Sequence, residues 1–377
     1  QAIIDEFGLD MKSTDKVKDL SVAYQQMVEI MKAYSRENLK MIAFDEPTAS
    51  LSDSEIDSLF RIIRKLKAEG KVIIYVSHRM AEIRQIADRV AIFKDGRFVG
   101  DSPMDAITDK ELVKKMVGRD LGDIFSGLSR NTAIGDVVLE VRNLSSPFLK
   151  DASFQVRAGE VVGFSGLVGA GRTEVVRAII GADPRTGGEV LLNGKPLNCR
   201  TPHDAIANGV VMVPEDRKLQ GIIPRMSVGK NISIGSLDQI TNRLGIVNTR
   251  REEQIGLDGK ANFNIKTPNL EKPIVELSGG NQQKAIVARW MSTKPEVLIL
   301  DEPTKGIDVG AKSEFYNMIC EFAKEGLAVI LISSELPEVI GLSDRIIVMR
   351  GRRIVGEISA KDATEEKLLS MAMMEET

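Results

Sequence analysis

One long series of landmarks occurs twice in the chain, and this duplication limits the possible folds more than any other feature. Asp45-Glu46-Pro47-Thr48 recurs 256 residues later as Asp301-Glu302-Pro303-Thr304. Matches at this offset, or at one residue more, include Ser77 with Ser333, Asp88-Arg89 with Asp344-Arg345, and Leu20-Ser21 with Leu277-Ser278. So long a period indicates a duplicated domain and not a short solenoid repeat.

Strands and helices alternate in both copies at the spacing of a parallel sheet with covering helices. The apolar runs Met41–Phe44 and Val72–Val76 predict strands buried on both faces. Residues from Val137 onward begin as an antiparallel sheet, and residues 217–285 form a separate, mainly helical lobe. The sequence therefore predicts an α/β protein with a parallel core sheet, an antiparallel β subdomain and a helical subdomain.

The two copies are expected to differ in completeness. The second copy has a glycine-rich loop that begins at Gly166, 111 residues before Leu277, and the same distance before Leu20 falls outside the chain. We therefore expect residues 1–117 to be the C-terminal part of a first domain, residues 118–136 a polar linker, and residues 137–377 a complete second domain. A fragment of this kind is expected to be weak or inactive by itself.

Composition excludes some classes of partner. With 377 residues, 43% hydrophobic and 28% charged, the chain has room for two ordinary globular domains. A net charge of −3 argues against a broad nucleic-acid-binding face. No apolar run approaches the length of a membrane span, so work at a membrane would require a partner that spans it.

The glycine-rich loop has the spacing that cradles phosphate groups. Its residues Gly166, Gly169, Ala170, Gly171, Arg172 and Thr173 follow a predicted strand, Val161–Phe164, and precede a predicted helix, Thr173–Ile180. Glycines let backbone amides approach phosphate oxygens, and a threonine hydroxyl in this place would hold Mg²⁺. Arginine replaces the usual lysine, and its planar fork is a poor substitute for a compact ammonium group. We expect nucleotide binding here, but not efficient hydrolysis; the alternative is a turn without a ligand.

Two acidic pairs follow apolar strands. Asp301 would bind Mg²⁺ and Glu302 would polarise the attacking water, and Asp45 and Glu46 would do the same in the first copy. The alternative for such a pair is a solvated charge cluster, which a position at the end of a fully apolar strand disfavours.

Further candidates surround these pairs. His78 follows a predicted strand and could reach a terminal phosphate, although a lone histidine is often structural, and its counterpart is Ser334. Glu215 occupies the place where a glutamine would normally sense Mg²⁺ and nucleotide. Phe148 could stack on adenine or pack in the core. Ser278, Gly279, Gly280 and Gln282 lie at a probable helix start, which favours an anion.

Taken together, these motifs resemble ATP-binding-cassette proteins, specifically the fused double-cassette ATPases of bacterial pentose and hexose importers. The segments that carry the likeness are Gly166–Thr173, Pro214–Lys218, Leu277–Lys284 and Ser333–Glu335. The resemblance implies a P-loop NTPase fold, with ATP and Mg²⁺ as cofactors. It also implies a peripheral position on the cytoplasmic face of the membrane, bound to a sugar permease that an external or periplasmic sugar-binding protein supplies.

In this family two cassettes pair head to tail, and each ATP lies between the glycine loop of one and the signature of the other. One site would then combine Asp45, Glu46 and His78 with Ser278-Gly279-Gly280. The other would combine Arg172, Glu302 and Ser334 with the segment Leu20–Tyr24, which lacks both glycines. The resemblance therefore predicts one competent and one degenerate site.

The predicted function is ATP hydrolysis that drives import of a monosaccharide, with ribose as the first choice and xylose, galactose and allose open. Two alternatives are a soluble double-cassette ATPase acting on ribosomes or DNA, and a nucleotide-binding fragment without turnover. The slightly acidic charge and the short linker disfavour the first alternative.

Overall fold

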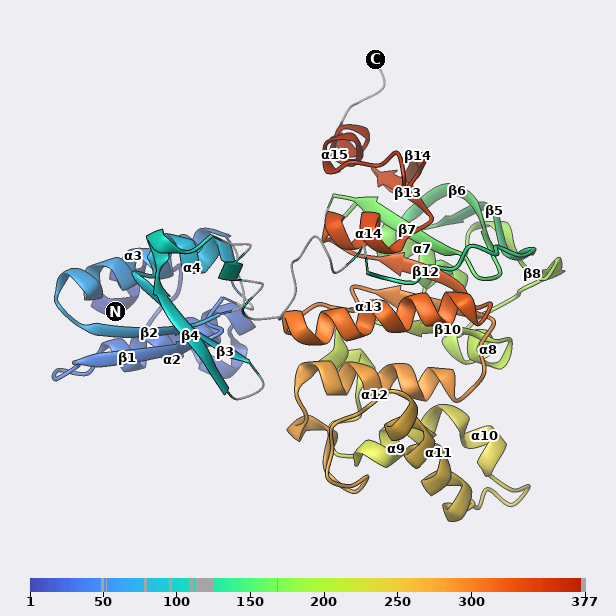
Figure 1. Ribbon diagram of the computed structural model, residues 1–377, viewed down its shortest axis with the longest axis horizontal. Helices are drawn as coiled ribbons and strands as arrows, with labels where there is room; N and C mark the ends of the chain where they lie inside the picture. The colour runs from blue at the N-terminus through green and yellow to red at the C-terminus, as the bar shows by residue number, and fades with distance from the viewer. Residues whose placement is uncertain are drawn as a thin grey trace. The chain divides into compact units, whose positions relative to one another are not determined.

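The computed structural model describes residues 1–48, 51, 53–77, 80–94, 97–108, 111, 112, 115, 125, 127–167 and 169–373. The chain divides into two compact units, Gln1–Leu121 and Gly122–Thr377 (Figure 1). This division falls within the segment that the sequence predicts as a linker. The domain boundaries themselves stay a prediction.

The first unit consists of short helices around two small sheets. Its elements are α1 (Ala2–Phe7), η1 (Val17–Asp19), α2 (Val22–Tyr34), β1 (Met41–Asp45), α3 (Asp53–Ala68), β2 (Val72–Val76), α4 (Met80–Ile86), β3 (Arg89–Lys94), β4 (Arg97–Pro103) and η2 (Met104–Ala106). β1 and β2 pair in parallel, and β3 and β4 pair as an antiparallel hairpin.

The second unit contains a large mixed sheet, an antiparallel sheet and a helical lobe. Its strands are β5 (Val137–Ser146), β6 (Leu149–Arg157), β7 (Val161–Gly166), β8 (Gly187–Leu192), β9 (Lys195–Pro196), β10 (Val210–Val213), β11 (Val297–Asp301), β12 (Ala328–Ile332), β13 (Arg345–Arg350) and β14 (Arg353–Ser359). Its helices are α7 (Arg172–Ile179), α8 (Pro202–Ala207), η3 (Arg217–Gly221), α9 (Val228–Ser233), η4 (Ile234–Ser236), α10 (Leu237–Ile240), α11 (Thr249–Asn262), η5 (Ile274–Glu276), α12 (Gly279–Met291), α13 (Val309–Lys324), α14 (Leu336–Leu342) and α15 (Glu365–Met373).

The core sheet has the strand order β10-β11-β12-β7-β13-β14. Its strands run parallel except β14, which forms an antiparallel hairpin with β13. The antiparallel sheet has the order β6-β5-β8-β9. A two-residue hairpin turn joins β8 to β9, with Asn193 at φ 50° and Gly194 at φ 73°. The predicted combination of core sheet, antiparallel sheet and helical lobe is confirmed.

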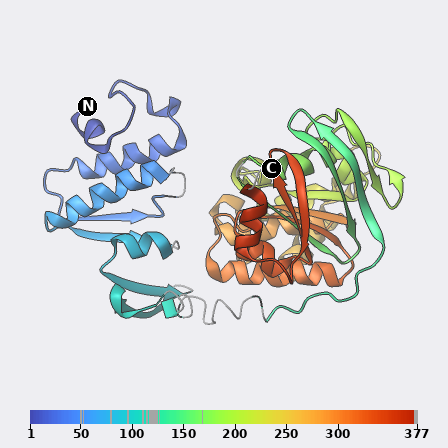
Figure 2. The same ribbon diagram turned by 90° about the horizontal axis from the view of Figure 1, so that it is seen from above.

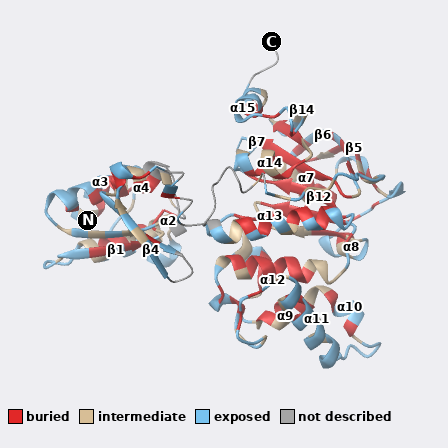
Figure 3. Cartoon of the chain, in the orientation of Figure 1, coloured by how far each residue is buried: buried red, intermediate tan, exposed pale blue. Residues whose placement is uncertain are grey.

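Side-chain alternation divides the core sheet of the second unit into two packed faces. Ile347 and Met349 of β13 face a core that α7 shares with β5 and β6. Ile346 and Val348 face the opposite way, toward α14 and α15. In Figure 2 the red helix α15 and the green strands β5 and β6 accordingly lie on opposite sides of the central strands. Because both faces are covered, β11 and β12 are buried along their whole length (Figure 3).

The prediction that β1 and β2 are buried on both faces is wrong. The residues of β1 alternate between exposed and buried, with Ile42 and Phe44 turned toward the core that α1, α2 and α3 share. Val72 is 58% exposed and Ile74 is 47% exposed. In the described part of the first unit this sheet has two strands, and helices cover only one of its faces. An all-apolar run cannot distinguish this arrangement from full burial.

The elements of the first unit repeat in the second at the offset seen in the sequence. β1, α3, β2 and α4 begin and end 256 residues before β11, α13, β12 and α14. The hairpins β3–β4 and β13–β14 even share a register shift, after Ile92 in the first unit and after Val348 in the second. In the part of both units that the structure describes, no helix is both long enough and apolar enough to span a membrane.

Candidate functional site

The glycine-rich loop joins β7 to α7 and leaves little room for side chains. A Cβ atom on Gly166 would lie 2.5 Å from the carbonyl oxygen of Met349, and one on Gly171, which has φ 105°, would lie 3.0 Å from the Cα of Arg352. Gly171 occupies the N-cap position of α7 without a side chain. The first N–H groups of α7 can therefore face an anion such as phosphate, as the sequence predicts.

A cavity of about 400 Å³ lies against this loop. Its lining residues are Gly169, Ala170, Gly171, Arg172, Thr173, Glu174, Glu215, Glu302, Lys305 and Ser334. Segments that lie far apart in the sequence thus meet at the carboxyl ends of the parallel strands, where ligands of open α/β sheets bind. The structure brings together the predicted loop with Glu215 and Glu302.

Asp301 is fully buried at the end of β11, and both of its carboxylate oxygens lack a hydrogen-bond partner among the described residues. The pKa of Asp301 is raised to about 7, chiefly by burial. Nearby Glu215 and Glu302 contribute in the same direction, whereas Thr173 and Arg172 act in the opposite direction. A buried carboxyl without partners is costly unless a cation or a proton neutralises it.

The side chains of Asp301 and Thr173 fit Mg²⁺ as a ligand. The described residues contain no cluster of three or more His, Cys, Asp or Glu side chains that could enclose a metal. Mg²⁺ is ordinarily held by one or two protein oxygens together with water and substrate phosphates, and Asp301 and Thr173 can supply those protein oxygens. Bound there, the ion would neutralise charge that develops on the phosphates.

Glu302 is held from two sides. Its Oε2 accepts a hydrogen bond of 2.9 Å from Ser334 Oγ, and its Oε1 lies 3.7 Å from Arg172 Nη2. Arg172 also donates from Nη1 to the carbonyl oxygen of Ser333 at 2.9 Å. The arginine of the glycine loop therefore ties that loop to the segment after β12 and to the predicted catalytic carboxylate.

Glu215 follows β10 and forms an ion pair with Lys305, with 2.8 Å between Oε1 and Nζ. The hydrogen bond to Glu215 raises the pKa of Lys305. Lys305 was not among the residues predicted from the sequence. Its position directly after the Asp-Glu-Pro-Thr motif is the signal that could have identified it.

The residues at the start of α12 do not line this cavity. Ser278 is the N-cap residue, and its Oγ accepts a hydrogen bond of 2.9 Å from Asn281 Nδ2. A Cβ on Gly279 would lie 2.8 Å from the carbonyl oxygen of Gly306, and one on Gly280 would lie 2.8 Å from Ala311 Cβ. Packing inside the unit therefore explains both glycines, and their contact with ATP stays a prediction.

Gln282 is buried, and its side chain is used within the protein. Its Nε2 donates to the carbonyl oxygen of Leu277 at 3.1 Å, and its Oε1 accepts from Arg217 Nε at 3.1 Å.

Phe148 is 47% exposed in the turn between β5 and β6. The alternative that Phe148 packs in the core is therefore wrong, whereas stacking on adenine stays a prediction.

In the first unit, Asp45 ends β1 and is exposed. Glu46 has φ 46° and donates its backbone N–H to the carbonyl oxygen of Val76 at 2.9 Å. His78 lies outside the described residues. The catalytic and metal-binding roles of these three residues stay predictions.

Comparisons with known proteins agree with this geometry. Residues 149–305 match the family model described as ABC transporter. All 377 residues align at 51% identity with the "Arabinose import ATP-binding protein AraG" of Mannheimia succiniciproducens, and they cover 74% of that protein. The chain is 47% identical over 373 residues, 99% of its length, to the "Putative ribose/galactose/methyl galactoside import ATP-binding protein 1" of Rhizobium etli, and covers 70% of it.

A solved ATP-binding cassette of an ABC transporter superposes with a TM-score of 0.54. It is 20% identical, and the match covers 63% of this chain and 99% of that one, so this likeness concerns the fold alone. The fold, the loop–carboxylate cavity and the relative that is half identical lead to one conclusion: the chain belongs to the ATPases of the ABC transporter family.

Proposed function

We propose that this protein is the ATP-hydrolysing subunit that powers import of a monosaccharide. The two relatives named above are import ATP-binding proteins, one for arabinose and one, putatively, for ribose, galactose and methyl galactoside. These names support a pentose or hexose as the cargo and include the predicted ribose. They give no support to the alternative of an ATPase acting on ribosomes or DNA.

The proposed partner is a permease in the membrane, which receives sugar from an external or periplasmic binding protein. The ATPase would bind to the permease at the cytoplasmic face of the membrane as a peripheral subunit. ATP with Mg²⁺ would be the cofactor, and Asp301 and Thr173 would hold the ion in the second unit.

The two units would act as a fused pair of cassettes. The shared offset of β1, α3, β2 and α4 with β11, α13, β12 and α14 supports this proposal. In a head-to-tail pair, Glu46 would work opposite Ser278-Gly279-Gly280. Glu302 would work opposite the segment Leu20–Tyr24, which lacks both glycines.

One observation carries the proposed asymmetry. Ser334 and Arg172 each contact one oxygen of the Glu302 carboxylate, so both oxygens already have a protein partner. A general base must reach the proton that it removes. The site of the second unit would therefore bind nucleotide with little turnover, and Glu46 would carry most of the hydrolysis.

Sugar uptake by the source organism tests the transport proposal. Interrupting the gene should abolish uptake of one radiolabelled monosaccharide from a panel of arabinose, ribose, xylose, galactose and allose, and restoring the gene should return it. Unchanged uptake of all five sugars would contradict the proposal. Uptake of an unrelated amino acid serves as the control for general damage to the cell.

A further inference from the structure

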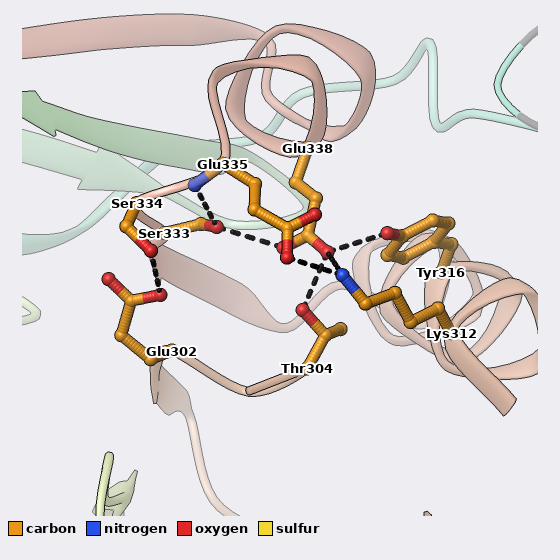
Figure 4. A network of polar contacts seen from close by, with 8 residues as sticks. All are labelled: Glu302, Thr304, Lys312, Tyr316, Ser333, Ser334, Glu335 and Glu338. Atoms are coloured by element: carbon orange, nitrogen blue, oxygen red, sulfur yellow. Dashed lines mark hydrogen bonds and ion pairs between the residues drawn. The ribbon is translucent and has the colours of Figure 1, made fainter. Parts of the chain in front are cut away.

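A buried glutamate lies behind the loops that carry Glu302 and Ser334. Glu338 of α14 is 1% exposed. Its Oε1 accepts hydrogen bonds from Thr304 Oγ1 at 2.5 Å and from Tyr316 OH at 2.6 Å, and its Oε2 accepts one from Ser333 Oγ at 2.9 Å (Figure 4). Lys312 Nζ lies 3.2 Å from Oε1. So many donors around one buried group fit an ionised carboxylate.

These donors come from three different segments. Thr304 belongs to the loop after β11, Ser333 directly follows β12, and Tyr316 and Lys312 lie on α13. Ser334 donates to Glu302, and Ser333 and Thr304 both donate to Glu338. Since the chain itself joins Ser333 to Ser334 and Glu302 to Thr304, these three hydrogen bonds close a ring (Figure 4). The position of the predicted catalytic carboxylate therefore depends on Glu338, which does not touch the cavity.

The first unit repeats the threonine and serine contacts around Glu82, which is 6% exposed. Thr48 Oγ1 donates to Glu82 Oε1 at 2.7 Å, and Ser77 Oγ donates to Oε2 at 3.1 Å. Thr48, Ser77 and Glu82 each lie 256 residues before Thr304, Ser333 and Glu338.

The tyrosine donor is also present in both units, but it comes from different elements. In the first unit Tyr75 of β2 donates to Glu82 Oε2 at 2.8 Å, and the counterpart of Tyr75 is Leu331. In the second unit the donor is Tyr316 of α13, whose counterpart is Phe60. Burial and the neighbouring Glu338 raise the pKa of Tyr316, which keeps the hydroxyl protonated as a donor. The tyrosine thus changes its place in the sequence while its hydrogen bond to the buried glutamate is kept. This exchange is explained if the fold requires the hydrogen bond and not a tyrosine at one fixed position.

We propose that Glu82 and Glu338 are positioning residues for ATP hydrolysis. Each glutamate fixes the loop that carries a catalytic carboxylate, Glu46 or Glu302, against the segment that follows the neighbouring strand. This inference rests on the proposed roles of Glu46 and Glu302. It adds a requirement for the threonine of each Asp-Glu-Pro-Thr motif, which acts through its hydroxyl on the buried glutamate.

The test compares Thr48→Val, which removes the hydroxyl at nearly constant shape, with Thr48→Ser, which keeps it. Hydrolysis of MgATP is measured under single-turnover conditions with the full-length protein in excess, so that slow cleavage is still detected. Thermal unfolding is followed in parallel. We expect Thr48→Val to lower the rate constant of cleavage about 10- to 100-fold, since misplacement by about 1 Å can cost this much, with less than a twofold change in the protein concentration at half-saturation. Thr48→Ser should recover most of the rate.

A purely structural role predicts a lower melting temperature with an unchanged rate per folded molecule, and that result would overturn the inference. If Thr48→Val does not fold, Ser77→Ala takes its place, with the same expected and contradicting results. Thr304→Val separates this inference from the proposed function. Equal rate losses for Thr48→Val and Thr304→Val would defeat the assignment of one competent site while still supporting the positioning role.

Discussion

The strand pairs β1–β2 and β11–β12 share one register but have different surroundings. Asp45 lies opposite Val76 as Asp301 lies opposite Ile332. Yet Ile74 is 47% exposed, whereas its counterpart Ile330 is fully buried. The difference teaches that pairing and strand length follow from local sequence, whereas burial depends on which other layers cover the sheet.

The polar ends of the two pairs agree closely despite this difference. Glu46 and Glu302 have φ values of 46° and 45°. Each donates its backbone N–H to the last carbonyl oxygen of the neighbouring strand at 2.9 Å. The geometry of the acidic pair therefore does not depend on a covered sheet. Differences in activity between the two pairs should come from the groups around each glutamate.

The largest expected effect concerns these two glutamates. Glu46→Gln should reduce ATP hydrolysis by roughly 100-fold or more, as expected for loss of a general base, whereas Glu302→Gln should reduce it only a few-fold. The comparison is made as turnover of MgATP by the full-length protein, with binding of a fluorescent ATP analogue as the control for intact nucleotide sites. Equal losses in the two variants would remove the functional difference between the units.

The next effect concerns the two isoleucines that occupy equivalent positions. Ile330→Ala should lower the free energy of unfolding by about 3 kcal/mol, because it leaves a cavity in a sheet covered on both faces. Ile74→Ala should cost less than about 1 kcal/mol, because much of that side chain already meets water. Urea unfolding, followed for the transition of each unit, measures both changes in the free energy of unfolding. Comparable losses would mean that the exposed face of β1–β2 is covered in solution.

A smaller effect separates the two aspartates. Burial raises the pKa of Asp301 to about 7, so the folded protein keeps a proton that the unfolded chain loses from about pH 4 upward. Stability should therefore fall as the pH rises from about 4 to 7 and then level off. Asp301→Asn should flatten this dependence and raise the free energy of unfolding at pH 8 by about 2 kcal/mol, because the cost of a buried amide offsets part of the gain.

Asp45→Asn is the matched control. Asp45 is exposed, so its replacement should change stability by less than about 0.5 kcal/mol at any pH in this range. At pH 8, Mg²⁺ should stabilise the parent protein more than it stabilises the Asp301→Asn variant, because the ion favours the charged carboxylate. A pH dependence that survives in Asp301→Asn would assign it to another group.

The candidate site was predictable where a motif fixes backbone geometry. Gly171 needs its positive φ, and the glycine loop and the acidic pair lie at strand ends, where short sequence patterns place them. The contacts between Arg172 and Ser333 and between Lys305 and Glu215 join residues far apart in the chain. No local pattern encodes those contacts, so they required the structure.

The error over β1 and β2 has a different cause. Val72-Ile73-Ile74-Tyr75-Val76 is apolar at every position, so it contains no alternation that could indicate a solvated face. No sequence pattern singles out Tyr75 or Tyr316, since each is an aromatic residue among apolar neighbours. The structure shows that both hydroxyls donate to a buried glutamate, Tyr75 to Glu82 and Tyr316 to Glu338. These two glutamates occupy equivalent positions, 256 residues apart.

The smallest expected effect tests that exchange of tyrosines. Tyr75→Phe and Tyr316→Phe should each lower the free energy of unfolding by about 1–2 kcal/mol, because each removes one donor from a buried carboxylate that keeps its other partners. Tyr316→Phe combined with Leu331→Tyr would give the second unit the arrangement of the first, and should recover part of the loss if the new hydroxyl reaches Glu338. The free energy of unfolding is measured in urea. If neither Tyr75→Phe nor Tyr316→Phe changes it, the tyrosine contact is incidental. A loss in only one unit would show that the two glutamates are supported differently, and would extend the contrast between the strand pairs to their polar ends.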